Sequence, residues 1–259
     1  MAPAGDEPGA GERRQRPHQP RRATPAVTQP AAITSHTPHH HAYPVVMSSS
    51  YARAERAELV EALKQAGPDA PTLCEGWSTR DLAAHVAVRE RRVDAAGGIL
   101  IKPLSQRLAR VQGEFAALPW DELLDMVAAG PSKRSLFGLQ AVDEAANTLE
   151  FFVHCEDVRR AKPGWEPRSL DPGLEEALWK RTSTLAKVVG RRSPVGLVLR
   201  RPDGQTVVAR KGTPVVTVTG KAPELAMFMS GRQGSSIVEV EGPEDAVASV
   251  RDAKFGVGL

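Results

Sequence analysis

The chain has 259 residues, 41% of them hydrophobic, which is enough for one large domain or two ordinary ones. Its formal net charge of +3, from 34 basic and 31 acidic residues, is too small to indicate a nucleic-acid-binding protein. Two cysteines exclude a disulfide framework and favour a reducing compartment, so we expect a cytoplasmic protein. No hydrophobic run is long enough to cross a membrane, so we expect no membrane association.

Residues 1–46 are predicted to form a disordered tail. They contain 8 of the 21 prolines, few aliphatic residues and no hydrophobic periodicity. No hydrophobic segment follows the two Arg-Arg pairs, so a twin-arginine export signal is rejected. Met47 is a more natural beginning, and we expect the first 46 residues to be dispensable for folding and metal binding.

The middle of the chain is predicted to be helical, because hydrophobic residues recur at helical spacing between Gly and Pro residues that end helices. Ser78 and Asp81 have the spacing of a capping box, and the pair Lys162-Pro163 ends the longest helix, because proline disfavours helical geometry in the residue before it. The expected helices cover residues 51–66, 79–96, 105–117, 119–129, 138–162 and 174–189.

Beyond Gly190 the hydrophobic pattern changes to the alternation of strands. A Pro-Asp-Gly turn at 202–204 joins the first two of these runs. The expected strands cover residues 195–201, 205–211, 215–219 and 237–241, and the expected helices 223–230 and 243–250. Helices segregated from strands indicate two domains, a helical one at 47–190 and a small α+β one at 191–259.

Three polar residues of the longest predicted helix, Glu150, His154 and Asp157, share one face. That face borders the hydrophobic positions, so these side chains need partners, because burying them unpaired is costly. A metal ion could be such a partner, and so could a neighbouring basic side chain. Glu and His four residues apart also commonly form a surface pair.

Five of the seven histidines lie in the tail, which leaves His85 and His154 in the folded part. His85 lies beside the hydrophobic stripe of the helix predicted at 79–96. Together with Glu150 these residues would supply two imidazoles and one carboxylate from two helices. Three protein ligands with open coordination positions are typical of catalytic metal sites, and this set suits Zn²⁺ as well as Fe²⁺ or Ni²⁺.

Several neighbouring residues are candidates for supporting roles. Arg89 and Arg92 follow His85 on its own side of the helix, where they would either bind an anionic group of a ligand or pair with acids such as Glu150. Cys74 is expected to be a small buried residue without a chemical role. We expect Glu156 to face solvent, and Asp157 to face an arginine such as Arg160 or Arg89.

Two segments resemble the mycothiol-dependent maleylpyruvate isomerase family, which belongs to the DinB/YfiT-like metal-binding bundles. They are LCEGWSTRDLAAHVAVRERR at 73–92 and LEFFVHCEDVRRAKP at 149–163. A GW loop, a helix with DLxAH and a later ExxxH helix form the specific combination, and the chain looks like an actinobacterial branch described as metal-binding proteins. The resemblance covers about residues 47–259.

This resemblance implies a DinB-like four-helix bundle followed by a small sterol-carrier-like α+β domain. It implies His85, Glu150 and His154 as the metal ligands, and an arginine of the second domain, best matched by Arg232 in MSGRQG, as a substrate-binding residue. Relatives often carry a histidine where this chain has Cys155, at a position pointing away from the ligand face.

The function that the resemblance implies is a zinc-dependent thiol transferase or isomerase. Mycothiol would be the co-substrate, and its thiolate would attack a small electrophile. Two alternatives stay open: a metal-dependent hydrolase that uses bound hydroxide, and a non-enzymatic binding module that the metal stabilises. The expected partners are small molecules, without nucleic acid or membrane, for a monomer or homodimer.

Overall fold

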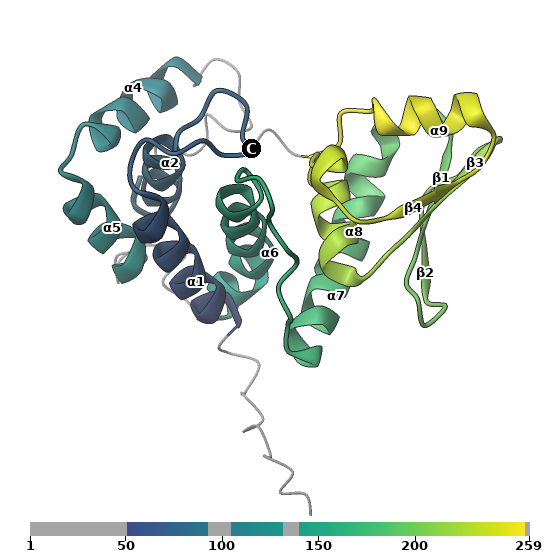
Figure 1. Ribbon diagram of the computed structural model, residues 1–259, viewed down its shortest axis with the longest axis horizontal. Helices are drawn as coiled ribbons and strands as arrows, with labels where there is room; N and C mark the ends of the chain where they lie inside the picture. The colour runs from purple at the N-terminus through teal and green to yellow at the C-terminus, as the bar shows by residue number, and fades with distance from the viewer. Residues whose placement is uncertain (1–50, 93–104, 132–139, 257–259) are drawn as a thin grey trace, which may run out of the picture. The chain divides into compact units, whose positions relative to one another are not determined.

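The computed structural model describes residues 51–92, 105–131 and 140–256 (Figure 1). The tail predicted at 1–46 lies outside these residues. The second helix ends at Arg91, before the predicted end at residue 96, and the backbone of Arg92 is no longer helical. No helix in the described ranges combines the length and the apolar character that crossing a bilayer requires.

The first half of the described chain is helical, as predicted. Its helices are α1 (Tyr51–Ala66), α2 (Thr79–Arg91), α4 (Ser105–Ala116), α5 (Trp120–Ala129) and α6 (Gln140–Arg159). The capping box at the start of α2 is confirmed, because Ser78 accepts a hydrogen bond from the Asp81 amide while the Asp81 carboxylate accepts one from the Ser78 amide. Helix α6 ends at Arg159, three residues before the predicted end, because the chain must leave helical geometry ahead of Pro163.

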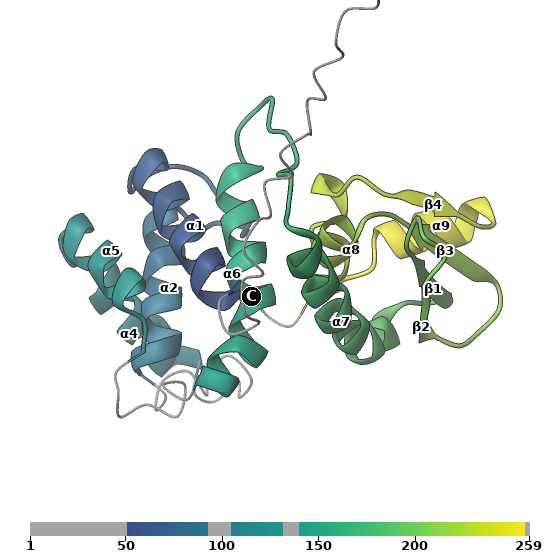
Figure 2. The same cartoon turned by 90° about the horizontal axis from the view of Figure 1, so that it is seen from below.

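Helices α1, α2, α5 and α6 share a hydrophobic core, and α1 lies beside α6 in both views of the ribbon (Figures 1 and 2). The largest fully buried side chains of this core are Leu59, Leu63, Leu82, Leu123 and Phe151. This packing holds α2 and α6 in the same helical assembly. The residues predicted to bind a metal come from these two helices.

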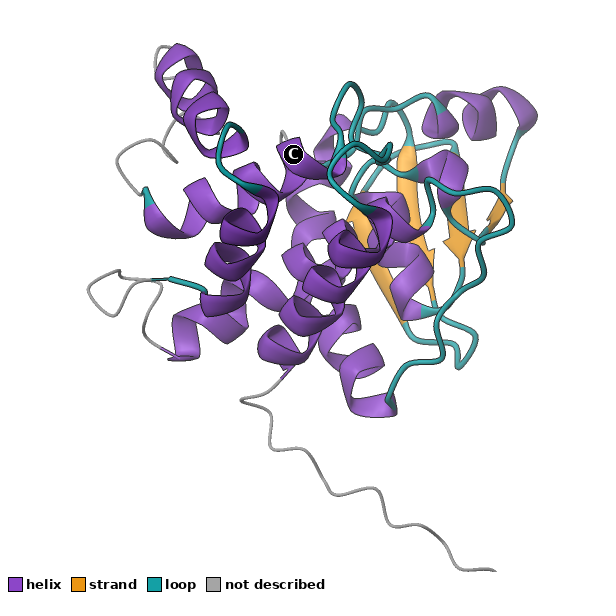
Figure 3. Ribbon diagram, turned by 60° about the vertical axis from the view of Figure 1, so that its left-hand side comes forward, coloured by secondary structure: helices purple, strands orange, loops and turns teal. Residues whose placement is uncertain are grey.

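The second half contains a small mixed sheet, which confirms the predicted α+β class. Its strands are β1 (Gly196–Arg200), β2 (Thr206–Arg210), β3 (Val215–Thr219) and β4 (Glu239–Glu241), in the order β2-β1-β3-β4. Strand β1 runs antiparallel to β2 and parallel to β3, and β3 runs antiparallel to β4. The helices are α7 (Pro172–Val189), α8 (Ala222–Met229) and α9 (Glu244–Arg251), and Figure 3 distinguishes them from the strands by colour.

Helix α7 packs in the same core as the sheet. Its buried side chains Leu178 and Trp179 share a hydrophobic cluster with Leu199 of β1, Val218 of β3 and Phe228 of α8. The sequence places α7 at the end of the helical domain, 47–190, and that boundary stays a prediction. The packing shows only that α7 contributes to the second core.

A buried charge network connects α1, α6, α8 and the segment after α6. It consists of Glu55, Glu156, Arg160, Arg168 and Glu224. Arg160 donates to Glu156 at 2.6 Å and to both carboxylate oxygens of Glu224 at 2.8 Å. Arg168 donates to Glu156 at 2.8 Å and to Glu55 at 2.7 Å. The prediction that Glu156 faces solvent is therefore wrong, because two arginines bind its carboxylate inside the protein.

Candidate metal centre

Three potential metal-ligand atoms converge where α2 meets α6. The Nε2 atom of His154 lies 3.3 Å from Oε1 of Glu150, and the Nε2 atom of His85 lies 3.7 Å from the same oxygen. All three atoms lie within 4.8 Å of one another. The structure thus brings together the three residues that the sequence predicts as ligands.

These three atoms are buried, and none has a hydrogen-bond partner among the described residues. Both imidazoles are at most 2% exposed, which excludes the alternative of a surface pair. A buried polar atom without a partner is costly, and three of them aimed at one point need a common partner. A divalent cation fits this arrangement, because each of the three atoms can donate a lone pair to it.

The opposite nitrogen of His154 is held by a carboxylate. Its Nδ1 atom lies 3.0 Å from Oδ2 of Asp157, so in the neutral form of the ring an Nδ1–H donor to Asp157 would leave the Nε2 lone pair facing Glu150 and His85. Arg232 fixes this carboxylate with two hydrogen bonds, from Nε at 2.8 Å and from Nη2 at 2.7 Å. A carboxylate bound to the second nitrogen of a ligating histidine is a common feature of metal sites, where it orients the ring.

Two expectations about arginines change with this geometry. Asp157 faces an arginine, as predicted, but this arginine is Arg232 and not Arg160 or Arg89, because Arg160 belongs to the buried charge network. The guanidinium of Arg232, predicted to bind substrate, is bonded to Asp157, so a direct substrate contact stays a prediction.

The two arginines that the sequence places beside His85, Arg89 and Arg92, differ in their positions. The Nε atom of Arg89 lies 3.4 Å from Glu150 Oε1, and its Nη1 donates to Asn147, so the predicted pairing with Glu150 is present. Arg92 is the C-cap residue of α2, at the limit of the described range, and its role at the site stays a prediction.

Cys74 is the residue near the site whose role the sequence did not reveal. Its thiol donates to Asp157 Oδ2 at 3.2 Å, and its sulfur accepts from Arg232 Nη2 at 3.3 Å. Cys74, His154 and Asp157 therefore form a second cluster of ligand-type atoms. The positive charge of Arg232 opposes a cation at that cluster, since like charges repel. The position of Cys74 in the GW loop before α2 was the available signal, because this loop hydrogen-bonds to α6 through Leu73.

Cys155 has no part in the site. It is buried in the core of the helical half, and burial raises the pKa of its thiol to about 12. A thiol with such a pKa stays protonated and unreactive at neutral pH.

The charges at the site are set by its close contacts. Burial alone would lower the pKa of His154, but its interactions with Asp157, Cys74 and Glu150 outweigh burial and raise that pKa well above its ordinary value. Burial lowers the pKa of His85. Burial would raise the pKa of Glu150, but the two histidines and Arg89 hold it well below its ordinary value. Without a metal, His154 therefore carries the proton of the site at neutral pH.

Metal binding at pH 7 is expected to release about one proton, which His154 gives up. The raised pKa makes His154 the protonated ligand, whereas His85 is already neutral and Glu150 already ionised. Because protons compete with the metal for His154, the affinity should fall as the pH falls. Calorimetric titration of metal into chelator-treated protein, in buffers of different ionisation enthalpy, measures the number of protons. Release of none or of two at pH 7 would contradict this assignment.

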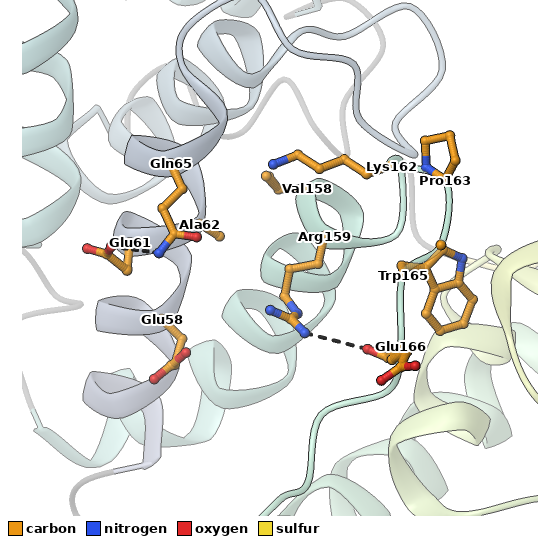
Figure 4. A pocket seen from close by; sticks show the side chains of 11 residues that line it. Glu58, Glu61, Ala62, Gln65, Val158, Arg159, Lys162, Pro163, Trp165 and Glu166 are labelled. Carbon is orange, nitrogen blue, oxygen red and sulfur yellow. Dashed lines mark hydrogen bonds between the residues drawn. The ribbon is translucent and has the colours of Figure 1, made fainter.

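A hollow of about 310 Å³ lies on the helical half, apart from the candidate metal centre (Figure 4). It lies between α1 and the end of α6, and Figure 4 shows that its walls mix the acids Glu58 and Glu61 with the bases Arg159 and Lys162. None of the predicted site residues lines it, so it is not part of the metal centre.

Comparison with known proteins tests whether the chain resembles the predicted family. Residues 50–112, which include His85, match the family model of the mycothiol maleylpyruvate isomerase N-terminal domain. This match confirms the predicted family resemblance. Among curated proteins, none matches the sequence.

Two solved structures are similar to the chain. The crystal structure of the mycothiol-dependent maleylpyruvate isomerase has 18% sequence identity and a TM-score of 0.53. A variant of that isomerase with one histidine changed to alanine has 16% identity and a TM-score of 0.54. Each comparison covers 76% of this chain and 94% of the other. At this identity the similarity establishes a shared fold.

Proposed function

We propose that this protein is a metal-dependent thiol transferase or isomerase that uses mycothiol as co-substrate on a small electrophile. The observation that carries the proposal is the convergence of three buried ligand atoms from His85, Glu150 and His154, none of which has a hydrogen-bond partner among the described residues. The match of residues 50–112 to the mycothiol maleylpyruvate isomerase N-terminal domain supports mycothiol as the thiol. Two imidazoles and one carboxylate suit Zn²⁺, which leaves a coordination position for a ligand.

A divalent metal held there would lower the pKa of a thiol that binds to it and so supply the nucleophilic thiolate at neutral pH. The residues of the chain provide the geometry. Asp157 holds the His154 ring so that Nε2 faces the centre, and Arg232 in turn fixes Asp157. Glu150 contributes a negative charge, which Arg89 partly balances. Trp77 packs against the His85 ring, with the ring centroids 5.0 Å apart, and limits its rotation.

Zinc-loaded protein is expected to bind mycothiol and to consume it in the presence of a reactive electrophile, whereas the metal-free protein should do neither. Thiol binding is measured by calorimetry and consumption by the loss of free thiol, against a panel of unsaturated and halogenated acceptors. Glu150→Gln is the matched variant, because it keeps the shape of the side chain and removes its charge.

Other outcomes of the mycothiol assays would favour one of the alternative functions. If metal-free and metal-loaded protein behave alike toward mycothiol, the thiol mechanism is wrong. Metal-dependent cleavage of ester or amide substrates would then favour a hydrolase. Protein that is inert in both assays but binds acyl chains would favour a binding module.

A further inference from the structure

The small sheet has two edges without a pairing partner. Strands β2 and β4 are its outer strands, and neither pairs with a further strand among the described residues (Figure 1). The edge of such a strand exposes backbone N–H and C=O groups that a strand of another chain can bind. The side chains around each edge therefore decide which strand can approach it.

Positive charge gathers around the β2 edge. Arg210, the last residue of β2, donates to the carbonyl oxygens of Arg191 and Ser193. These bonds hold the segment after α7 against the end of β2, and α7 itself contacts β2. The cations at this edge are Lys187, Arg191, Arg210 and Lys211. In the described part of the chain, none of the four forms an ion pair.

Negative charge gathers around the β4 edge. The acids there are Glu239 and Glu241 of β4, and Glu244 and Asp245 at the start of α9. All four residues are exposed. Glu241 pairs with Arg200 at 3.3 Å, whereas the other three acids have no ion-pair partner among the described residues. The sheet thus carries opposite charges at its two edges.

Exposed hydrophobic side chains lie beside the same two edges. In the described part of the chain, the large hydrophobic residues that are exposed are Val188, Val208, Val215 and Ile237. Val208 belongs to β2, and Val188 to the end of α7. Ile237 lies two residues before β4, and Val215 packs against Gly242 directly after it. Each edge therefore combines charge with uncovered apolar surface, which suits the binding of a partner.

The opposite signs restrict which partner can bind. Charged residues commonly keep sheet edges apart, because edges of like sign repel each other. Here this protection acts between two β2 edges and between two β4 edges. It fails between β2 of one copy and β4 of another, where attraction replaces repulsion and the exposed hydrophobic side chains of both edges become covered.

We propose that this protein associates with a second copy of itself, the β2 edge of one copy binding the β4 edge of the next. The contact joins two different surfaces, so an assembly of any length keeps one β2 edge and one β4 edge free. It grows as an open chain, or closes into a ring where the rotation between copies allows it. Neither edge contains a proposed metal ligand, so the association does not depend on the proposed thiol chemistry.

The backbone of β2 is arranged for such a contact. The Arg201 amide donates to the Gln205 carbonyl, where the antiparallel pairing of β2 with β1 begins. Because alternate residues bond across an antiparallel pair, Thr206 and Val208 direct their N–H and C=O groups to the free side. Binding of β4 there would satisfy these groups and extend the sheet into a second copy.

Sedimentation velocity of the full-length protein tests the association. The average mass should rise reversibly as the concentration increases from about 1 μM to about 1 mM, the range in which transient contacts form. The association constant should fall at least about threefold when salt increases from about 0.05 M to about 0.5 M, because salt screens exposed charges. A protein that stays monomeric throughout this range would overturn the proposal.

Two charge-reversal variants test the pairing of the edges. Arg191→Glu/Lys211→Glu changes the β2 edge and Glu239→Lys/Glu241→Lys the β4 edge, all at exposed residues, so both variants should fold. Each variant alone should associate at least about tenfold more weakly than the wild type. An equimolar mixture should form a heterodimer and nothing larger, because each variant keeps the edge that the other lacks.

The control for these variants is Lys64→Glu/Arg110→Glu, which reverses two charges on exposed residues of α1 and α4. It should associate within about twofold of the wild type, because it leaves both edges intact. Wild-type association by either edge variant alone, or a mixture of the two that stays monomeric, would contradict the pairing.

Hydrogen exchange locates the contact without any substitution. From low to high concentration, amide exchange should slow in peptides that cover 205–211 and 237–242, and most at Thr206 and Val208. Peptides of α1 and α4 should exchange alike at both concentrations. Slower exchange in α1 or α4 without a change at β2 and β4 would place the contact on the helical half and overturn the proposal.

Discussion

Replacing His154 with alanine is expected to lower the affinity for Zn²⁺ by at least about 100-fold. Loss of an outer partner of a metal ligand typically costs 10-fold to 100-fold, and loss of the ligand itself should cost no less. Because the metal binds only the folded state, saturating Zn²⁺ at about 100 times the dissociation constant should stabilise the wild type by about 2.7 kcal/mol. The variant should lose this gain, which thermal unfolding with and without Zn²⁺ measures.

Matched variants separate the ligands from their surroundings. His85→Ala and Glu150→Ala should behave like His154→Ala, whereas Asp157→Asn should have the smaller effect of an outer partner. Glu114→Ala is the control for charge, because Glu114 is exposed on α4 and pairs only with Arg110 at 3.8 Å among the contacts seen. Stoichiometric metal in all three ligand variants would place the site elsewhere.

Replacing Arg160 with methionine is expected to destabilise the protein by about 3–5 kcal/mol, because removing one partner leaves buried charges uncompensated. The side chain of Arg160 is 1% exposed and pairs with both Glu156 and Glu224, so methionine preserves the volume but removes the arginine that binds Glu224, whereas Glu156 keeps Arg168 at 2.8 Å. Urea unfolding monitored by circular dichroism measures the change.

The control for this variant is Arg200→Met. Arg200 and Glu241 form a pair at 3.3 Å whose side chains are 44% and 54% exposed. Such surface pairs contribute about 1 kcal/mol or less. Equal destabilisation by the two substitutions would show that the buried charge network does not behave as a unit.

Local chemistry made much of the fold predictable from the sequence. Ser78 and Asp81 fixed the start of α2 through their reciprocal hydrogen bonds, and Pro163 limited the extent of α6. The spacing of Glu150 and His154 on one helix, together with the scarcity of other histidines, indicated the three residues whose side chains the structure brings together, and their role as metal ligands stays a prediction. Each of these features depends on residues close in the chain or on composition.

Contacts between distant residues could not be predicted in the same way. Glu156 is buried because Arg168 and Arg160 meet it, and no periodicity within α6 shows where Arg168, twelve residues away, will lie. The contact between Arg232 and Asp157 joins residues 75 positions apart. Cys74 and Asp157 are likewise distant in sequence, and their contact arises only when the loop before α2 docks on α6.

Zinc K-edge X-ray absorption on zinc-loaded protein, without added thiol, tests the metal assignment most directly. The structure contains two clusters of ligand-type atoms that share His154, and only the second includes a sulfur atom, that of Cys74. If His85, Glu150 and His154 bind the metal, the spectrum should show only nitrogen and oxygen ligands at about 2.0–2.2 Å. A sulfur ligand at about 2.3 Å would contradict the assignment and place the metal beside Cys74 and Asp157.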